Sequence, residues 1–148
     1  GQGRGVKKIT NRQLLEIKAD ILILAALENQ ITATNADRIQ ADYLVEMANG
    51  PIDNEADKIL AAAGKVVVPD ILANAGGVTV SYLEWVQDRH GYFWTEKEVN
   101  ERLEAKMCQA FNTVLETAKK YNVDMRAAAY VVAIGRVATV TKLRGMYA

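Results

Sequence analysis

Three short apolar runs constrain the fold of this chain more than any other feature of its sequence. They lie at residues 20–26, 42–47 and 65–70, and segments with helical patterns separate them. The first run lacks the alternation of a half-exposed strand, which predicts a strand buried on both faces of a parallel sheet. Strands that alternate with helices at short intervals predict a parallel sheet with helical crossovers.

The helical segments among these runs have recognisable boundaries. Thr10 and Gln13 have the spacing of a capping box and predict a short helix. Residues 30–40 predict a short, weak helix, and residues 53–63 a helix that stops at Gly64. Three parallel strands make a thin sheet whose faces and edges need cover, so we expect further strands in a preceding part of the protein.

The second half of the sequence predicts long helices. Thr95 and Glu98 form a second capping box, and apolar residues then recur at helical spacing as far as Tyr121. Residues 125–141 are apolar almost all round, which predicts a helix buried by several partners. The predicted fold class is therefore α/β, with a parallel sheet of about three strands followed by long C-terminal helices.

Composition and charge exclude several classes of function. Eighteen acidic residues balance eighteen basic ones, so we expect neither a nucleic-acid partner nor a membrane partner. The only cysteine, Cys108, excludes an internal disulfide and a cysteine metal cluster, and we expect it to be a small buried hydrophobe. The sequence shows no signal peptide and no apolar run of membrane-spanning length, so we expect a cytoplasmic protein.

Candidate binding residues follow the predicted strands, because open parallel sheets bind ligands at the carboxyl ends of their strands. Asn49 and Asn74 each offer a donor and an acceptor there, although Asn49-Gly50-Pro51 also fits a simple turn. The paired glycines Gly76-Gly77 open a predicted helix and leave backbone N–H groups accessible to a ligand. Ser81 lies one turn further along that helix and can reach the same space as Val78.

Several motifs together closely resemble the glutamate dehydrogenase family. In consistent order they read AALENQIT at 25–32, ANGP at 48–51, EADKIL at 55–60, VPDILANAGG at 68–77 and NAGGVTVSYLEWVQ at 74–87. The resemblance runs from about Val6 to the final helix. It implies that residues 1–92 are the C-terminal half of a Rossmann-like dinucleotide-binding domain, and that residues 93–148 are a helical segment packing back on a substrate domain.

The resemblance also implies an activity and a set of binding residues. The parent enzyme would interconvert L-glutamate with 2-oxoglutarate and ammonia using NAD or NADP, as a homohexamer. Ser81, Val78 and Asn74 would bind the substrate, with the Ser81 hydroxyl on its side-chain carboxylate. Ala25, Ala26, Asn49 and Asn74 would bind the cofactor. No catalytic residue and no metal ligand is implied here, because the family's catalytic lysine and aspartate lie upstream.

Departures from the family pattern leave alternatives open. The family usually has proline at the position of Leu24 and glycine at that of Met47, whose side chain adds bulk near Asn49. The opening residues 1–5 lack the strand and the spacing of a dinucleotide-binding glycine turn, so we expect a fragment that is inactive alone. The alternatives are a leucine, phenylalanine or valine dehydrogenase, and a non-catalytic truncated or engineered domain.

The remaining polar and aromatic residues have structural interpretations. We expect His90 to be a surface or capping residue at a helix end. The aromatic residues Trp85, Tyr92, Phe93 and Trp94 are expected to pack as a cluster rather than stack on a cofactor. Asp70 fits a helix cap slightly better than a residue that supports the site.

Overall fold

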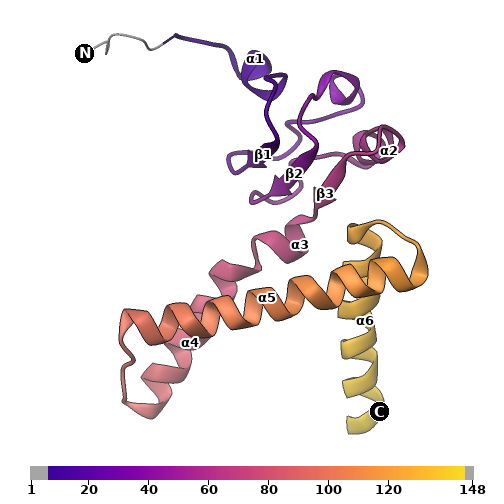
Figure 1. Ribbon diagram of the computed structural model, residues 1–148. Coiled ribbons are helices and arrows are strands. Elements are labelled where there is room, and N and C mark those ends of the chain that lie inside the picture. The colour runs from indigo at the N-terminus through magenta and orange to yellow at the C-terminus, as the bar shows by residue number, and fades with distance from the viewer. Residues whose placement is uncertain (1–6, 146–148) are drawn as a thin grey trace.

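A computed structural model describes residues 7–145 of the chain as a parallel sheet standing on a layer of long helices (Figure 1). The glycine-rich opening and Val6 lie outside the described residues. The sheet half contains α1 (Asn11–Leu15), β1 (Ile21–Leu24), the 3-10 helix η1 (Ala36–Arg38), β2 (Tyr43–Glu46), α2 (Asn54–Ala62) and β3 (Val66–Val68). The helical half contains α3 (Asp70–Ala73), α4 (Ala75–His90), α5 (Glu96–Tyr121) and α6 (Met125–Arg144).

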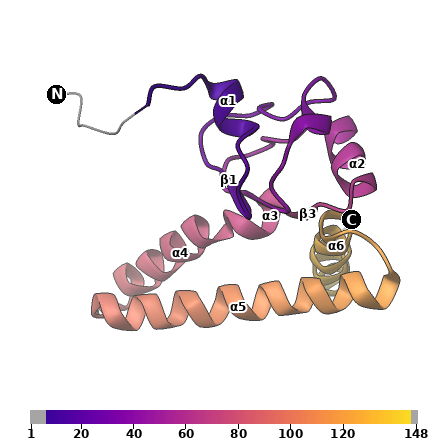
Figure 2. The same ribbon diagram turned by 45° about the horizontal axis from the view of Figure 1, so that its top comes forward.

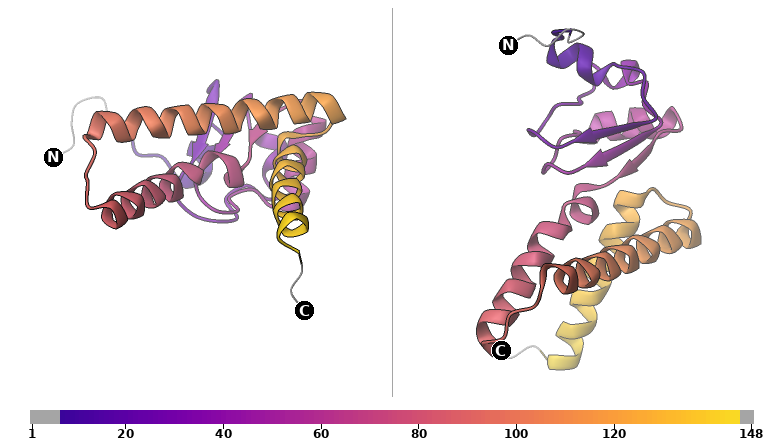
Figure 3. Two further views of the ribbon diagram at one scale, coloured as in Figure 1. Left: turned by 90° about the horizontal axis from the view of Figure 1, so that it is seen from below. Right: turned by 60° about the vertical axis from the view of Figure 1, so that its left-hand side comes forward.

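The sheet confirms the predicted parallel α/β arrangement. Its strands lie in the order β1-β2-β3, and Leu44 of β2 pairs with Leu22 of β1 and Val67 of β3. All three strands therefore end at the same edge of the sheet, from which the chain leaves through α3 into the helical layer (Figure 3). That edge carries the candidate binding residues.

Residues 7–145 cover only one face of the sheet along its whole length, so the predicted burial of β1 on both faces is not present in the described chain. Leu22 and Leu24 are buried in a core with residues of η1 and α2, whereas Ile21 and Ile23 are 57% and 61% exposed. Apolar residues point to both faces of β1, but the described chain has a covering layer for only one of them. Tyr43 of β2 is also exposed on the uncovered face.

Helix boundaries agree with the capping signals. Thr10 and Thr95 each form a complete capping box, and the Asp53 and Asp124 side chains cap α2 and α6. The predicted helix at residues 30–40 is wrong, because only three of its residues form η1. Instead, Ile31 pairs with Ile52 as an isolated bridge, which satisfies backbone groups that a helix would have used.

The helical half has its own small core. Helices α4 and α5 form a hairpin, and α6 crosses the far end of α5 (Figure 2). Leu72 of α3 packs there with residues of α5 and α6, and Val68 of β3 packs against the same cluster. None of the helices in residues 7–145 is both long and apolar enough to cross a membrane.

Within residues 7–145, burial in this half differs from three predictions. Helix α6 is buried only in its first turns, and Val137 and Leu143 are 68% and 82% exposed. Cys108 is exposed rather than buried. Tyr92 and Phe93 are exposed and do not form the predicted aromatic cluster. Trp94 packs instead under the guanidinium of Arg102, whose Cζ atom lies 4.1 Å from the centroid of the Trp94 ring. In each case the apolar side chains have no covering element in the described chain.

Candidate functional site at the carboxyl edge of the sheet

Hydrogen bonds join the three segments that follow the strands. The Asn29 amide donates to the Gly50 carbonyl oxygen at 2.9 Å, which ties the loop after β1 to the turn after β2. The Gly50 amide donates to Asp70 Oδ2 at 2.9 Å, and Asn74 Nδ2 donates to Asn49 Oδ1 at 2.6 Å. The turn that carries Asn49 is therefore fixed from both sides.

Local sequence explains the shape of this turn. Gly50 has a φ of +55°, a conformation that glycine adopts without strain, and the buried Pro51 follows it. Before the turn, the amides of Met47 and Ala48 both donate to the Leu24 carbonyl oxygen, at 2.9 and 2.8 Å. The chain thus leaves β2 in a direction that brings Asn49 to the start of the helical layer.

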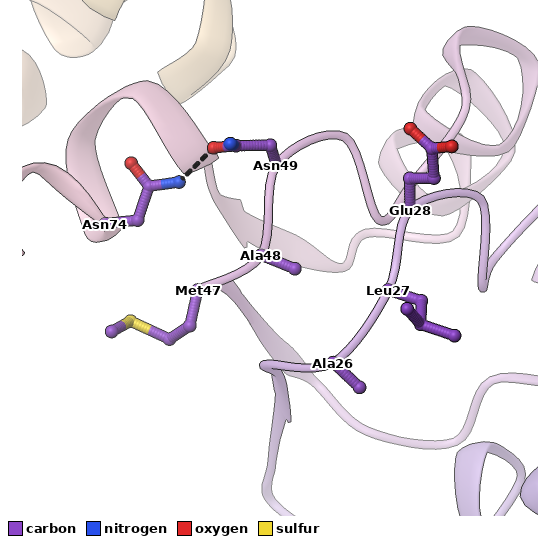
Figure 4. Close-up of a pocket in the computed structure, with 7 residues that line it drawn as sticks. All are labelled: Ala26, Leu27, Glu28, Met47, Ala48, Asn49 and Asn74. Atoms are coloured by element: carbon purple, nitrogen blue, oxygen red, sulfur yellow. Dashed lines mark hydrogen bonds between the residues drawn. The ribbon is translucent and has the colours of Figure 1, made fainter.

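A pocket of about 610 Å³ opens beside this turn (Figure 4). The pocket contains three of the residues that the family resemblance assigned to ligand binding: Ala26, Asn49 and Asn74. Ala25, the fourth candidate for cofactor binding, is exposed in the same loop but does not line the pocket. The full lining of the pocket comprises Ala26, Leu27, Glu28, Met47, Ala48, Asn49 and Asn74.

The two asparagines leave polar atoms for a ligand. Their mutual hydrogen bond uses Asn74 Nδ2 and Asn49 Oδ1, and no partner within residues 7–145 binds Asn49 Nδ2 or Asn74 Oδ1. One donor and one acceptor therefore remain at the pocket, which suits a ligand that carries a carboxamide group. Met47 is 45% exposed and lines the pocket, so its bulk faces the ligand space instead of displacing Asn49.

The candidate substrate residues on α4 lie outside this pocket. Val78 is 71% exposed and Ser81 is also exposed on the same helix. As predicted, the glycine pair lies in the first turn of α4, and a Cβ on Gly77 would meet nothing within 4 Å. The surface of α4 beside Gly77 is therefore accessible, but the described chain forms only one side of any site there.

A partly buried cluster of ion pairs centres on Arg126, and its member Asp70 contacts the turn beside the pocket. Arg126 of α6 donates to Asp57 Oδ2 at 2.6 Å, to Glu46 Oε2 at 2.8 Å and to Asp70 Oδ1 at 3.4 Å. Glu46 is fully buried, and burial raises the pKa of its carboxyl despite the Asp70 amide and the Arg126 charge, which lower it. Burial also opposes the charge on Arg126, but Asp57 and Glu46 together raise its pKa above the ordinary value.

Several of these residues were missed or misassigned from the sequence. Asp70 is not the N-cap of α3, a position that Pro69 occupies; its carboxylate accepts the Gly50 amide at Oδ2 and the Ile71 amide at Oδ1. Glu28 lines the pocket although it carried no separate prediction. Glu46 could have been recognised from its place within an apolar strand, because a charged side chain that is buried there requires a partner. Among residues 7–145, no group of three or more histidine, cysteine, aspartate or glutamate side chains could hold a metal ion.

Comparison with known proteins extends over almost the whole sequence. The profile of the Glutamate/Leucine/Phenylalanine/Valine dehydrogenase family matches residues 2–145. The chain is 59% identical to a glutamate dehydrogenase of Thermotoga maritima over 95% of its own length and 34% of that protein. It is 54% identical to the catabolic NAD-specific glutamate dehydrogenase RocG of Bacillus subtilis, over 93% of its own length and 32% of that protein.

Solved structures give the same result for the fold. A hetero-hexameric glutamate dehydrogenase from Thermus thermophilus, in a leucine-bound form, superposes with a TM-score of 0.91 at 35% identity, covering 97% of this chain and 35% of that one. A glutamate dehydrogenase from Peptoniphilus asaccharolyticus superposes with a TM-score of 0.80 at 50% identity, covering 84% of this chain and 32% of that one. The chain thus spans about a third of the length of the relatives it matches.

Proposed function

The chain belongs to the glutamate/leucine/phenylalanine/valine dehydrogenase family, and on this premise we propose that it is part of a glutamate dehydrogenase. The whole enzyme would interconvert L-glutamate with 2-oxoglutarate and ammonia by hydride transfer to or from a nicotinamide cofactor. In this proposal residues 1–92 complete a Rossmann-like cofactor domain, and residues 93–148 pack back on the substrate domain. The uncovered sheet face at Ile21 and Ile23 supports a domain completed by further chain.

The Asn49–Asn74 pair is the observation that carries this proposal. It brings two amides from different strand ends to one pocket and leaves one donor and one acceptor for a ligand. A nicotinamide cofactor bound there would supply the hydride acceptor or donor, while these amides would orient its carboxamide. We further propose NAD rather than NADP, because relatives at 51–54% identity are named NAD-specific.

Ser81 and Val78 are proposed as the substrate-binding residues. An exposed hydroxyl one helical turn beyond an accessible glycine can donate to the side-chain carboxylate of glutamate. Ser81→Ala, placed in the complete enzyme, should then lower kcat/KM for glutamate roughly 10- to 100-fold, the effect of one hydrogen bond to a charged group. Norvaline has no such carboxylate and should be affected little, whereas equal losses on both substrates would remove Ser81 from this role.

Assembly and location belong to the same proposal. We propose a hexamer, which is supported by the hexameric Thermus thermophilus relative, and a cytoplasmic location. A purely non-catalytic role for the chain is the competing proposal.

A hybrid enzyme tests the proposed function. This chain would replace the matching third of the Thermotoga maritima glutamate dehydrogenase, to which it is 59% identical. We expect the hybrid to fold, assemble and reduce NAD with glutamate, and Asn74→Ala in the hybrid to weaken that activity. A folded, assembled hybrid without activity would contradict the proposal and favour the non-catalytic alternative.

A further inference from the structure

Arg126 connects three separate elements of the fold. It lies in the first turn of α6 and donates to carboxylates at the end of β2, in α2 and at the start of α3. These carboxylates belong to Glu46, Asp57 and Asp70. One guanidinium therefore holds α6 to the carboxyl edge of the sheet, in a geometry that its planar set of five donors makes possible.

The same cluster reaches the pocket through Asp70. Asp70 Oδ1 accepts from the Ile71 amide at 2.8 Å and from Arg126 Nη1 at 3.4 Å, and Asp70 Oδ2 accepts from the Gly50 amide, next to Asn49. The Asp70 backbone amide donates to Glu46 Oε2 at 2.8 Å, and that oxygen also accepts from Arg126. Asp70 is thus fixed at its backbone and at Oδ1, and its Oδ2 atom holds the Gly50 amide of the turn.

We propose that Arg126 is a positioning residue for the cofactor pocket, acting through Asp70 to hold the Asn49–Gly50 turn at hydrogen-bonding distance from Asn74. Its effect on cofactor binding rests on the proposed function, but its effect on the turn does not. Arg126 is not itself a pocket residue, since the pocket lining contains no residue of α6.

The energetic argument depends on the burial of Glu46. Its side chain has no exposed surface, and its Oε1 atom is buried without a partner, so Oε2 carries every contact that offsets the burial of the carboxylate. Removal of Arg126 would leave a buried charge with one backbone hydrogen bond, which is a costly arrangement. Glu46 would then have to take up a proton or move, and the Asp70 carboxylate that anchors the turn would lose its contact with Arg126.

Four variants of the 148-residue chain separate this role from general stabilisation. Asp70→Asn and Asp57→Asn are a matched pair, because each weakens one Arg126 contact by the same chemical change but only Asp70 contacts the turn. Arg126→Lys retains the charge and loses the planar fork, and Arg126→Gln loses both. Backbone order parameters of Asn49 and Gly50 would be measured by NMR relaxation, with thermal unfolding as the test of overall folding.

We expect the order parameters at Asn49 and Gly50 to fall from about 0.85 to below about 0.6 in Arg126→Gln and Asp70→Asn, and partway in Arg126→Lys. Asp57→Asn should leave them near the wild-type values even where its unfolding temperature falls. Unchanged order parameters at Asn49 and Gly50 in a folded Arg126→Lys or Arg126→Gln chain would overturn the proposal. An equal fall of these order parameters in Asp57→Asn would also overturn it.

Titration of the same variants with NAD separates the two proposals. In the hybrid enzyme, Arg126→Lys and Asp70→Asn should weaken the affinity for NAD about tenfold or more, and Asp57→Asn by less than about threefold. A wild-type hybrid that fails to bind NAD would count against the proposed function alone, because the order parameters measured on the chain still decide the role of Arg126.

Discussion

Asn74 donates a hydrogen bond to Asn49 across 2.6 Å, although the two residues lie 25 positions apart in the sequence. The contact joins the turn after β2 to the junction between α3 and α4. It is the point where the sheet and the helical layer meet at the pocket. The cofactor proposal therefore predicts that the two amides act as a unit.

A double-mutant cycle tests that coupling. Asn49→Ala and Asn74→Ala should each weaken NAD binding by the hybrid enzyme, and the double variant should be little worse than either single one. The expected coupling free energy is about 0.5–3 kcal/mol, the range for residues in direct contact. Ser81→Ala with Asn49→Ala is the control pair, since Ser81 lies outside the pocket, and its effects should add. Additive losses in the asparagine cycle would contradict a joint role.

The buried Glu46 carboxyl predicts a particular pH dependence of stability. Its pKa in the folded chain is raised above the ordinary 4.5, so the folded state retains the proton that the unfolded state releases. The stabilising contribution of Glu46 to the free energy of unfolding is therefore fully present below about pH 4.5, and it is lost as the pH rises through the pKa of the folded state. Relative to Glu46→Gln, the wild-type free energy of unfolding should fall with increasing pH over that window.

Urea unfolding of both proteins at a series of pH values measures this difference. The slope, rather than the offset, is the test, because Glu46→Gln also alters the contact with Arg126 at every pH. A wild-type curve that rises relative to the variant would show that the Arg126 charge outweighs burial and that the folded pKa is lowered.

Strand positions and helix starts could be predicted from the sequence because their signals are local. The capping boxes at Thr10 and Thr95 place side-chain acceptors three residues from the amides that they satisfy, so no other part of the protein is needed. The apolar runs are similarly sufficient to predict parallel strands, and β1, β2 and β3 confirm them. Asn49 and Asn74, to which the motif resemblance gave binding roles, both line one pocket, but their roles stay a prediction.

Burial could not be predicted in the same way, because it depends on what lies opposite a residue. Ile23, Val137 and Cys108 are apolar residues whose neighbours in the described chain leave them exposed. Asp70 was misassigned for a related reason: its partner Gly50 is 20 positions away, and proximity to a helix start favoured a cap. The Arg126 contact with Glu46 spans 80 positions and has no local signal.

Adjacent residues of β1 test whether the uncovered sheet face is covered in the complete enzyme. In the isolated chain, Leu22→Ala should lower the free energy of unfolding by about 2–5 kcal/mol, the usual cost for a buried leucine. Ile23→Ala should cost less than about 1 kcal/mol there, because Ile23 is 61% exposed. In the hybrid enzyme the Ile23→Ala cost should approach that of Leu22→Ala. A cost that stays small in the hybrid would show that this face remains open.

The glycine pair at the start of α4 predicts that stability and binding change in opposite directions. A Cβ on Gly77 would meet nothing within 4 Å, whereas one on Gly76 would lie 3.8 Å from Leu103 Cδ1 of α5. Neither glycine has a positive φ, and alanine in a helix is favoured over glycine by about 0.5–1 kcal/mol. Both Gly76→Ala and Gly77→Ala should therefore raise the free energy of unfolding of the chain by about that amount.

Only one of the two substitutions should affect ligand binding. The Gly77 methyl group would enter the space that the substrate proposal gives to glutamate beside Ser81, while the Gly76 methyl group would contact α5. In the hybrid enzyme we expect Gly77→Ala to raise KM for glutamate about tenfold or more, the effect of about 1.4 kcal/mol, with Gly76→Ala near the wild type. Equal KM values for both variants would mean that the accessible backbone at Gly77 does not contact the substrate, and the binding face of α4 would have to be sought elsewhere.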